Sequence, residues 1–582
     1  MDQQQHDNRY RYLNLSRTEL DRKWKLHLER ESFDQMSAPS GLPGGGAGTA
    51  IIQGSVLLTT KFTGSTVTLY INFFGAQKTT INWGDGTTSN EITGTVNIQH
   101  TYDKTDDDLI TIEVFFKDLE PQSAVGFQVQ GYNGEKVTEL NFIRLNDISE
   151  LNEYNEEISQ MPRIQESNTL NGITFIGMPQ FEFSSGVALP NTVTVINVAG
   201  NNIQNFDPTF PLPTALDELN LSDNQIYVFD PTHPLPSSLT VLTLTNNHLQ
   251  GFNPEELLPA SLKILELSSN DIGEFTTTNI PPALDDLYLG YNGMYNFNPG
   301  PSDGSYKNLD LRHNGLAGFS PQFPLPSRLE TLNLSYNGIY EFAPNPALPN
   351  SLKYLYLNNN ILNMFDAGVL PNALTVLNLK YNQLTNFGNE QGGTPLPSTL
   401  NALDLSYNQL TEFNPINSSL PNLSTLTLNN NQLTSFDPLM AMPNIYDLNL
   451  SFNQLTSFDP SITLGSNLRF IDLSNNLLTS FNPAQPLPSN LSQLDLHSNQ
   501  LTSFTPSSLP SSLKTYFLYF NKLNVSAVND ALVCIDAATV GGGGFTPKIV
   551  ALFYQQPPAA PTGAGLTAKT NLQAKGYVVY TD

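Results

Sequence analysis

Apolar and polar residues alternate in one short pattern along most of the chain. Leu219-Asn220-Leu221 is typical, and an asparagine follows three positions after its second leucine. Successive side chains of a strand point to opposite faces, so this alternation predicts a short strand with one buried and one exposed face. The chain is therefore expected to contain many short strands of a single kind.

The pattern recurs at intervals of 22 or 23 residues, with one interval of 26 residues between Asn382 and Asn408. A fixed period of this length predicts a solenoid in which each unit stacks on the next. An asparagine amide has donors and an acceptor for backbone groups that would otherwise be buried unpaired, so we expect these asparagines to form a ladder. The predicted ladder consists of Asn201, Asn224, Asn247, Asn270, Asn292, Asn314, Asn337, Asn360, Asn382, Asn408, Asn431, Asn453, Asn476, Asn499 and Asn521.

A phenylalanine stands five positions after nearly every one of these asparagines, from Phe206 to Phe504. We interpret this column as a second row of the core, because it follows the turn at a constant position; the alternative is an aromatic binding surface. The proline-rich stretches that come next disfavour helix, so the return side of each unit is expected to be extended.

These units, of the form LPSSLxxLxLSxNQLTSFxP, resemble the leucine-rich repeat. The resemblance implies a parallel-strand solenoid over residues 171–523, with a mostly non-helical convex side. The fold class is thus a repeat solenoid, preceded by a small β-sandwich and an N-terminal helix.

The β-sandwich is predicted for residues 51–118, where alternating runs such as TVTLYINFF and LITIEVFF are separated by turns. The motifs Trp83-Gly84-Asp85-Gly86 and His100-Thr101-Tyr102 resemble the PKD domain, an immunoglobulin-like module. That resemblance implies structural roles, with the tryptophan in the core and the glycines in a turn. Residues 119–170 are interpreted as an N-terminal cap or connector.

Residues 1–36 differ from the rest of the chain, because seven of its 26 basic residues lie among the first 30. A helix-capping sequence precedes Leu20, Trp24 and Leu28, which share one face of a predicted helix. The Gly- and Pro-rich residues 37–50 are predicted to be a flexible linker. Such a helix either docks on a partner or folds back on its own chain, and the sequence leaves both open.

The C-terminal residues 524–582 depart from the repeat and read as helix, strand, helix and strand. We expect them to form an αβ cap over the last unit. The stretches NDALVCI and AAPTGAGLTAKTNLQAKGYVV resemble caps of repeat proteins in bacteriophage tail fibres and bacterial surface proteins.

Composition narrows the range of functions. A net charge of −27 and a pI of about 4.5 argue against nucleic acid and against docking on an anionic membrane. No apolar stretch approaches the length needed for membrane insertion, and the first residues lack the pattern of a secretory signal. Cys534 is the only cysteine, so neither a disulfide within the chain nor a thiolate metal cage is expected. No cofactor and no metal are predicted.

Motifs for catalysis are missing from the sequence, including a P-loop, a nucleophile elbow and a zinc-protease helix. The carboxylates of Glu218, Glu266 and Asp310 fall on the predicted concave strands and resemble a glycosidase pair in type, but such pairs are expected by chance on a regular acidic surface. The chain is predicted not to be an enzyme.

Binding is the better interpretation, because aromatic residues line the predicted concave face. The residue before the ladder asparagine is aromatic in several units, namely Tyr291, His313, Tyr336, Tyr381, Tyr407 and Phe452. These rings suit a sugar or an extended protein partner; alternatively, they shield the strand edge near the turn. We leave both interpretations open.

The sequence favours a non-catalytic virion protein of a bacteriophage, a tail fibre or another host-attachment component on the particle surface. Its partners would be other virion proteins through the N-terminal helix and a host cell-surface glycan or protein through the concave face, and a homo-oligomer is compatible with this role. One alternative is a bacterial interaction protein or effector with leucine-rich repeats. Another is a surface polysaccharide hydrolase.

Overall fold

The computed structural model describes most of the chain from residue 54 to residue 582. Within that range it does not describe residues 63–65, 74–77, 93–95, 103–109, 118–123, 132–136, 147–149, 155–162, 168–171, 177–187, 209, 253–257, 277–279, 299–305, 388–394, 416–418, 438–440, 461–463 and 540–547. The predicted anchoring helix with Leu20, Trp24 and Leu28 and the linker at 37–50 therefore lie outside the described residues.

The described part of residues 54–176 consists of strands. Their bounds are β1 (Gly54–Phe62), β2 (Thr66–Phe73), β3 (Lys78–Asn82), β4 (Thr88–Ile92), β5 (Val96–Thr101), β6 (Ile110–Lys117), β7 (Ala124–Gly131), β8 (Val137–Asn146), β9 (Glu150–Tyr154), β10 (Arg163–Ser167) and β11 (Gly172–Ile176). One sheet has the order β10-β8-β1-β6-β3-β4, and a second antiparallel group has the order β5-β2-β7. The segment interpreted as a cap or connector thus supplies β7, β8 and β10 to these sheets.

Trp83 is buried in this region and contacts side chains from several neighbouring segments. Its side chain is 1% exposed, its Nε1 donates to Ser89 Oγ at 2.9 Å, and its ring stacks on His100 with centroids 4.6 Å apart. The hydroxyl of Tyr102 donates to the carbonyl of Trp83 at 2.9 Å. Gly84 has a φ of +81°, and a Cβ there would lie 2.1 Å from a carbonyl oxygen of the neighbouring strand, so only glycine fits. These residues have structural roles; the resemblance to a PKD domain stays a prediction.

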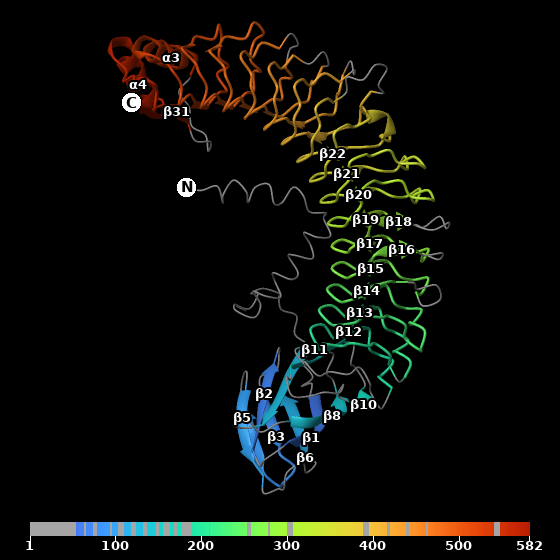
Figure 1. The fold of residues 1–582 in the computed structure, drawn as a ribbon. Coiled ribbons are helices and arrows are strands. Elements are labelled where there is room, and N and C mark those ends of the chain that lie inside the picture. Colours follow the sequence, from blue (N-terminus) through green and yellow to red (C-terminus); the bar gives the residue numbers. More distant parts are fainter. Residues whose placement is uncertain are drawn as a thin grey trace, which may run out of the picture. The chain divides into compact units, whose positions relative to one another are not determined.

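Each repeat supplies one short strand to a parallel sheet (Figure 1). The strands are β12 (Val195–Asn197), β13 (Glu218–Asn220), β14 (Val241–Thr243), β15 (Ile264–Glu266), β17 (Asp286–Tyr288), β19 (Asn308–Asp310), β20 (Thr331–Asn333), β21 (Tyr354–Tyr356), β22 (Val376–Asn378), β23 (Ala402–Asp404), β24 (Thr425–Thr427), β25 (Asp447–Asn449), β26 (Phe470–Asp472), β28 (Gln493–Asp495) and β30 (Thr515–Phe517). Their central apolar residues face one another in register, as Leu219 faces Leu242. The predicted parallel-strand solenoid is confirmed.

The repeat sheet continues into the strands that precede it. β7 pairs in parallel with β9, β9 with β11, and β11 with β12, so the antiparallel group β5-β2-β7 and the repeat strands form one ladder of hydrogen-bonded strands. Among the described strands, β5 pairs only with β2 and β32 (Val578–Thr581) only with β31 (Ile549–Leu552). A closed barrel would require the two end strands, β5 and β32, to pair with each other. This row of hydrogen-bonded strands is therefore an open sheet.

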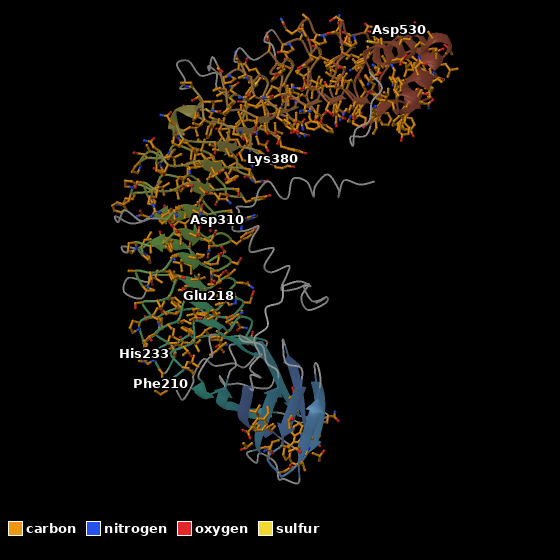
Figure 2. All side chains as sticks on the ribbon, turned by 180° about the vertical axis from the view of Figure 1, so that it is seen from behind. Phe210, Glu218, His233, Asp310, Lys380 and Asp530 are labelled. Atoms are coloured by element: carbon orange, nitrogen blue, oxygen red, sulfur yellow. The ribbon has the colours of Figure 1, made fainter. Side chains whose placement is uncertain are left out.

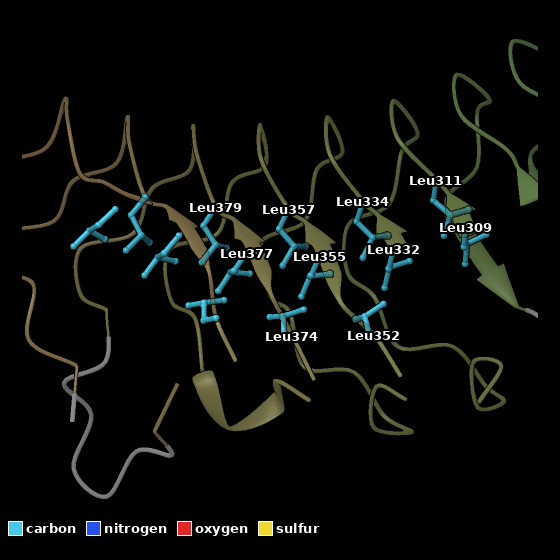
Figure 3. Packing of buried hydrophobic residues seen from close by; sticks show 14 of the residues in the cluster. Leu309, Leu311, Leu332, Leu334, Leu352, Leu355, Leu357, Leu374, Leu377 and Leu379 are labelled. Carbon is cyan, nitrogen blue, oxygen red and sulfur yellow. The ribbon is translucent and has the colours of Figure 1, made fainter. Parts of the chain in front are cut away.

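Leucines and phenylalanines fill the interior in parallel rows. Figure 3 shows leucines of successive repeats, such as Leu332, Leu355 and Leu377, which are fully buried. The phenylalanine column forms a second row, in which Phe436 stacks on Phe413 and on Phe458 with centroids 6.4 and 6.3 Å apart. Burial of so much apolar surface in a regular array replaces the single globular core of other folds.

The return side of the repeats contains little regular structure, as predicted. The described elements there are the two-stranded pairs β16 (Glu274–Thr276) with β18 (Asn296–Asn298) and β27 (Ser480–Phe481) with β29 (Ser503–Phe504), and the 3₁₀ turn η2 (Ala367–Val369). No α-helix occurs on this side within the described part of the repeats.

The ladder asparagines bind backbone groups of two adjacent repeats. Asn431 is representative: its Oδ1 accepts from the N–H of Leu410 at 3.0 Å, and its Nδ2 donates to the carbonyls of Leu405 and Leu428 at 2.9 and 3.0 Å. Gln555 continues the ladder beyond the repeats, with its Oε1 accepting from Leu523 N–H at 3.1 Å. Each amide therefore fastens one turn of the solenoid to the next.

The C-terminal segment folds in the predicted order of α3 (Val525–Ala538), β31, α4 (Gly563–Ala574) and β32. β31 pairs in parallel with β30, so the sheet extends beyond the last repeat. α3 buries Val528, Leu532 and Ile535. The segment adds two strands to the sheet and helices beside them, and β32 becomes the edge strand.

Tyr516 occupies a leucine position in β30, and this predicts a stabilising substitution. Its hydroxyl is buried and has no hydrogen-bond partner among the described residues. We expect Tyr516→Phe to raise the free energy of unfolding by about 1 kcal/mol, because it removes a polar group that folding desolvates without compensation. Urea denaturation measures the change. Tyr102→Phe is the matched control and should destabilise, because that hydroxyl donates a hydrogen bond; a loss of stability in Tyr516→Phe would contradict the expectation.

The exposed face of the parallel sheet

The side chains on either side of each central strand leucine form a surface that we call the sheet face. Glu218 and Asn220 are on this face, and Leu219 between them is buried. Figure 2 places Glu218, Asp310 and Lys380 on one side of the ribbon and Phe210 and His233 on the other. Because neighbouring strands lie about 4.8 Å apart, side chains of successive repeats form closely spaced rows on this face.

The last position of the strand has a structural role in many repeats. An asparagine or acidic side chain there accepts a hydrogen bond from the backbone N–H two residues later, at 2.9–3.2 Å; examples are Asn220, Glu266, Asp310, Asn333, Asn378, Asp404, Asn449, Asp472 and Asp495. This arrangement closes the turn that follows the strand. The carboxylates of Glu266 and Asp310 are therefore engaged in turns.

The three carboxylates weighed for glycoside hydrolysis are not neighbours. Glu218, Glu266 and Asp310 lie on β13, β15 and β19, and β14 and β17 are interposed between these strands. The structure thus places no two of them on adjacent strands.

The predicted aromatic column lies at the edge of the sheet face, in an unusual backbone conformation. Tyr291, His313, Tyr336, Tyr381, Tyr407 and Phe452 all have φ between +52° and +57°. Bulky residues are rare in this left-handed region, which costs about 1–2 kcal/mol for a residue with a side chain. Most other repeats have Asp, Asn or Ser at this position, which tolerate it better, whereas the last repeat has Phe520. The column thus combines backbone strain with exposed rings, because Tyr291, Tyr336 and Phe452 are among the exposed apolar residues.

Most of these rings stack on one another along the column. Centroids are 4.1 Å apart for Tyr291 and His313, for His313 and Tyr336, and for Tyr381 and Tyr407. His313 has a ring against each of its faces, whereas each tyrosine of these stacks has a ring against one face. Stacking thus reduces the ring surface that a sugar could use, most of all at His313.

Two basic side chains lie over this column. Arg312 contacts the Asp310 carboxylate at 3.1 Å and lies over the Tyr291 ring at 5.7 Å. Lys380 Nζ lies 5.0 and 5.1 Å from the ring centroids of Tyr381 and Tyr407. Cation–π attraction of this kind is worth about 0.5–1 kcal/mol at exposed sites.

A row of carboxylates in the later repeats was not singled out from the sequence. Asp447, Asp472 and Asp495 come from β25, β26 and β28, and Asp472 faces Asp495 directly in the strand register. Burial and the neighbouring Asp472 raise the pKa of Asp447 to about 6. The signal was present in the sequence as acids at the strand positions of consecutive repeats, but their proximity depends on the register.

The raised pKa of Asp447 predicts how stability depends on pH. Its folded-state pKa, about 6, lies above the ordinary value of 3.8, so the folded chain binds this proton more tightly. Ionisation at neutral pH therefore opposes folding, and this penalty is relieved as pH falls from about 6 to about 4. Asp447→Asn should raise the free energy of unfolding at pH 7.5 by about 1–3 kcal/mol, with the difference from the original chain vanishing near pH 4. Urea titrations across this range test it, and a variant that is less stable at pH 7.5 would contradict it.

Among the described residues, no cluster of His, Cys, Asp and Glu side chains is arranged to hold a metal ion. Likewise, none of the described helices has both the length and the apolar character that a membrane span requires.

Family models for repeats match several parts of the chain. Models described as leucine-rich repeats match residues 214–272, 398–439, 421–463 and 490–512, and a model described as the FNIP repeat matches residues 344–382. No curated protein sequence matches the chain.

Several solved structures are similar to the solenoid. YopM from Yersinia enterocolitica is 25% identical, with a TM-score of 0.45 over 63% of this chain and 80% of that one. YopM from Yersinia pestis, titled a leucine-rich effector protein, is 23% identical, with a TM-score of 0.41 over 63% of this chain and 88% of that one. A leucine-rich-repeat protein of Leptospira interrogans is 22% identical, with a TM-score of 0.37 over 61% and 85%.

Proposed function

Because the chain is a leucine-rich-repeat protein with a solenoid fold, we propose that it is a non-catalytic interaction protein that binds an extended polypeptide along its sheet face. The observation that carries the proposal is the regular sheet face itself. From β12 to β30 it presents side chains in fixed register, rich in amides, hydroxyls, carboxylates and rings. A partner that lies along this face meets many small contacts at once, which add up to a specific interface.

A polypeptide fits this face better than a glycan. Tyr381 and Tyr407 each cover one ring face of the other, which reduces the ring surface open to a sugar. Carboxylates, amides and the cations Arg312 and Lys380 offer charge and hydrogen-bond complementarity to a peptide.

The biological setting belongs to the proposal as well. An interaction protein or effector is favoured over a virion attachment protein, because every family model that matches the chain describes a repeat. The virion interpretation depends on the resemblance of residues 51–118 and 524–582 and stays a prediction, together with its partners and its location. Quantitative mass spectrometry of purified particles tests it: a fixed copy number would restore it, and absence from particles would remove it.

Selection from a library of displayed random peptides tests the binding activity. The full chain should enrich related peptide sequences, and hydrogen exchange of the chain with a selected peptide should slow for the amides of the repeat strands. Slower exchange confined to the return side, or no enrichment of related sequences, would contradict the proposal.

A further inference from the structure

The chain supplies its own cation where carboxylates and rings meet in the middle of the sheet face. Arg312 lies between the Asp310 carboxylate and the Tyr291 ring. Lys380 lies over Tyr381 and Tyr407. Burial raises the pKa of the nearby Asp404 carboxyl, and the charge of Lys380 opposes this rise. In both places a positive charge offsets a partly desolvated carboxylate and contacts a ring.

The same combination of groups recurs in the later repeats. Asp447, Phe470, Asp472, Asp495, Phe517 and Tyr519 form what we call the carboxylate–aromatic patch. Asp447 faces Phe470 in the strand register, and Asp472, Asp495 and Phe517 face one another in succession on β26, β28 and β30.

Ring contacts join the members of the patch on its C-terminal side. Tyr519 packs edge-to-face on Phe517, with centroids 6.1 Å apart, and stacks on His497 at 4.5 Å. His497 Nδ1 in turn lies 2.6 Å from Asp495 Oδ1. Burial raises the pKa of Tyr519 to about 12, and the charges of Asp495 and Asp472 add to this rise.

The patch differs from the middle of the sheet face in its cations. Among the described residues, His497 is the basic group that acts on these carboxylates, and it lowers the pKa of Asp472 only against the larger effects of burial and Asp495. Arg469 and Lys514 precede β26 and β30, yet neither contributes to the pKa of Asp447 or Asp472. In the described part of the chain, the three carboxylates of the patch thus lack the lysine or arginine that the same combination has in the middle of the sheet face.

We propose that the carboxylate–aromatic patch binds lysine or arginine side chains of an extended segment of a partner polypeptide, an inference that rests on the proposed function. Opposite charge favours such side chains, and Phe470, Phe517 and Tyr519 offer ring contacts to the cation. An extended peptide carries side chains of one face about 7 Å apart, and long basic side chains span the difference from the strand spacing of about 4.8 Å.

The test uses the full chain and a short labelled peptide of alternating lysine and serine, with a glutamate–serine peptide as the comparison. The patch variant combines Asp447→Asn, Asp472→Asn and Asp495→Asn. It should fold, because asparagine closes at Asn333 and Asn449 the same turn that Asp472 and Asp495 close. Asp447 is the first residue of its strand, a position that asparagine occupies at Asn308. The charge-matched control combines Asp286→Asn, Asp310→Asn and Asp404→Asn, which lie at the equivalent first and third strand positions.

Fluorescence anisotropy then measures affinity. The patch variant should bind the lysine peptide at least about tenfold more weakly than the original chain, and the control within about twofold, because screened surface charges alone contribute little. The inference is overturned if both variants lose affinity equally, if neither does, or if the glutamate peptide binds as well. If peptides from the random library still slow exchange of the repeat strands in that case, the proposed function stands and the inference alone fails.

Discussion

Replacing Phe436 by alanine is expected to lower the free energy of unfolding by about 3–5 kcal/mol, the usual cost of removing a large ring from a packed interior. The ring is 3% exposed and lies between Phe413 and Phe458, so its loss leaves a cavity and two uncovered ring faces. Each repeat contacts only its neighbours, so the damage should be greatest locally.

Denaturant titration together with hydrogen exchange measures this effect, because exchange reports which repeats open first. Phe365→Ala is the matched control: Phe365 belongs to the same column but is only partly buried, and its loss should cost less. A small loss in Phe436→Ala, no greater than about 1 kcal/mol, would show that the column is not a packed core.

The second large effect is expected at the ladder. Asn431→Ala removes the acceptor for Leu410 N–H, which is then buried without a partner. The carbonyls of Leu405 and Leu428 each lose one of two amide donors and keep those of Asn408 and Asn453. The unpaired N–H costs about 1–3 kcal/mol and each hydrogen bond lost at a carbonyl about 0.5–1.5 kcal/mol, so we expect a total loss of about 3 kcal/mol.

Asn430→Gly is the control for this substitution. Asn430 precedes the ladder asparagine and has a φ of +56°, a conformation that glycine adopts without strain. Its loss should change the free energy of unfolding by less than about 1 kcal/mol. A mild effect at Asn431 would mean that water replaces the side chain, and the ladder would then not fasten the repeats.

The repeat itself could be predicted because the chemistry of each position is local. Leu219 and Leu221 alternate within one strand, and Asn224 follows at the same offset in every unit, so period and residue type sufficed. Gln555 takes the same role as the ladder asparagines but lies outside any repeat motif. Because it is a glutamine, the sequence did not identify it as a member of the ladder. The pairing of β7 with β9 could not be predicted either, because the strands that link the antiparallel group to the repeat strands have no repeated sequence pattern.

The properties of the sheet face could not be predicted from the sequence, because they arise between repeats. The sequence identified the ring of Tyr381, but not its left-handed backbone or its stacking on Tyr407, since these arise between repeats. Nor did it show that Lys380 offsets the charge of Asp404 while Asp447 has no such partner. Register alone brings side chains of different repeats together, and a single repeat does not contain that information.

Photocrosslinking from two equally exposed positions tests most directly whether partners bind the sheet face. Tyr354 lies on β21 and is 38% exposed, and Phe210 lies on the opposite side of the repeats and is 37% exposed (Figure 2). A photoreactive benzoylphenylalanine at either position would be illuminated with a library-selected peptide bound to the full chain. We predict crosslinks from position 354 and few from position 210. Crosslinks mainly from position 210 would contradict the proposal that the sheet face is the binding surface.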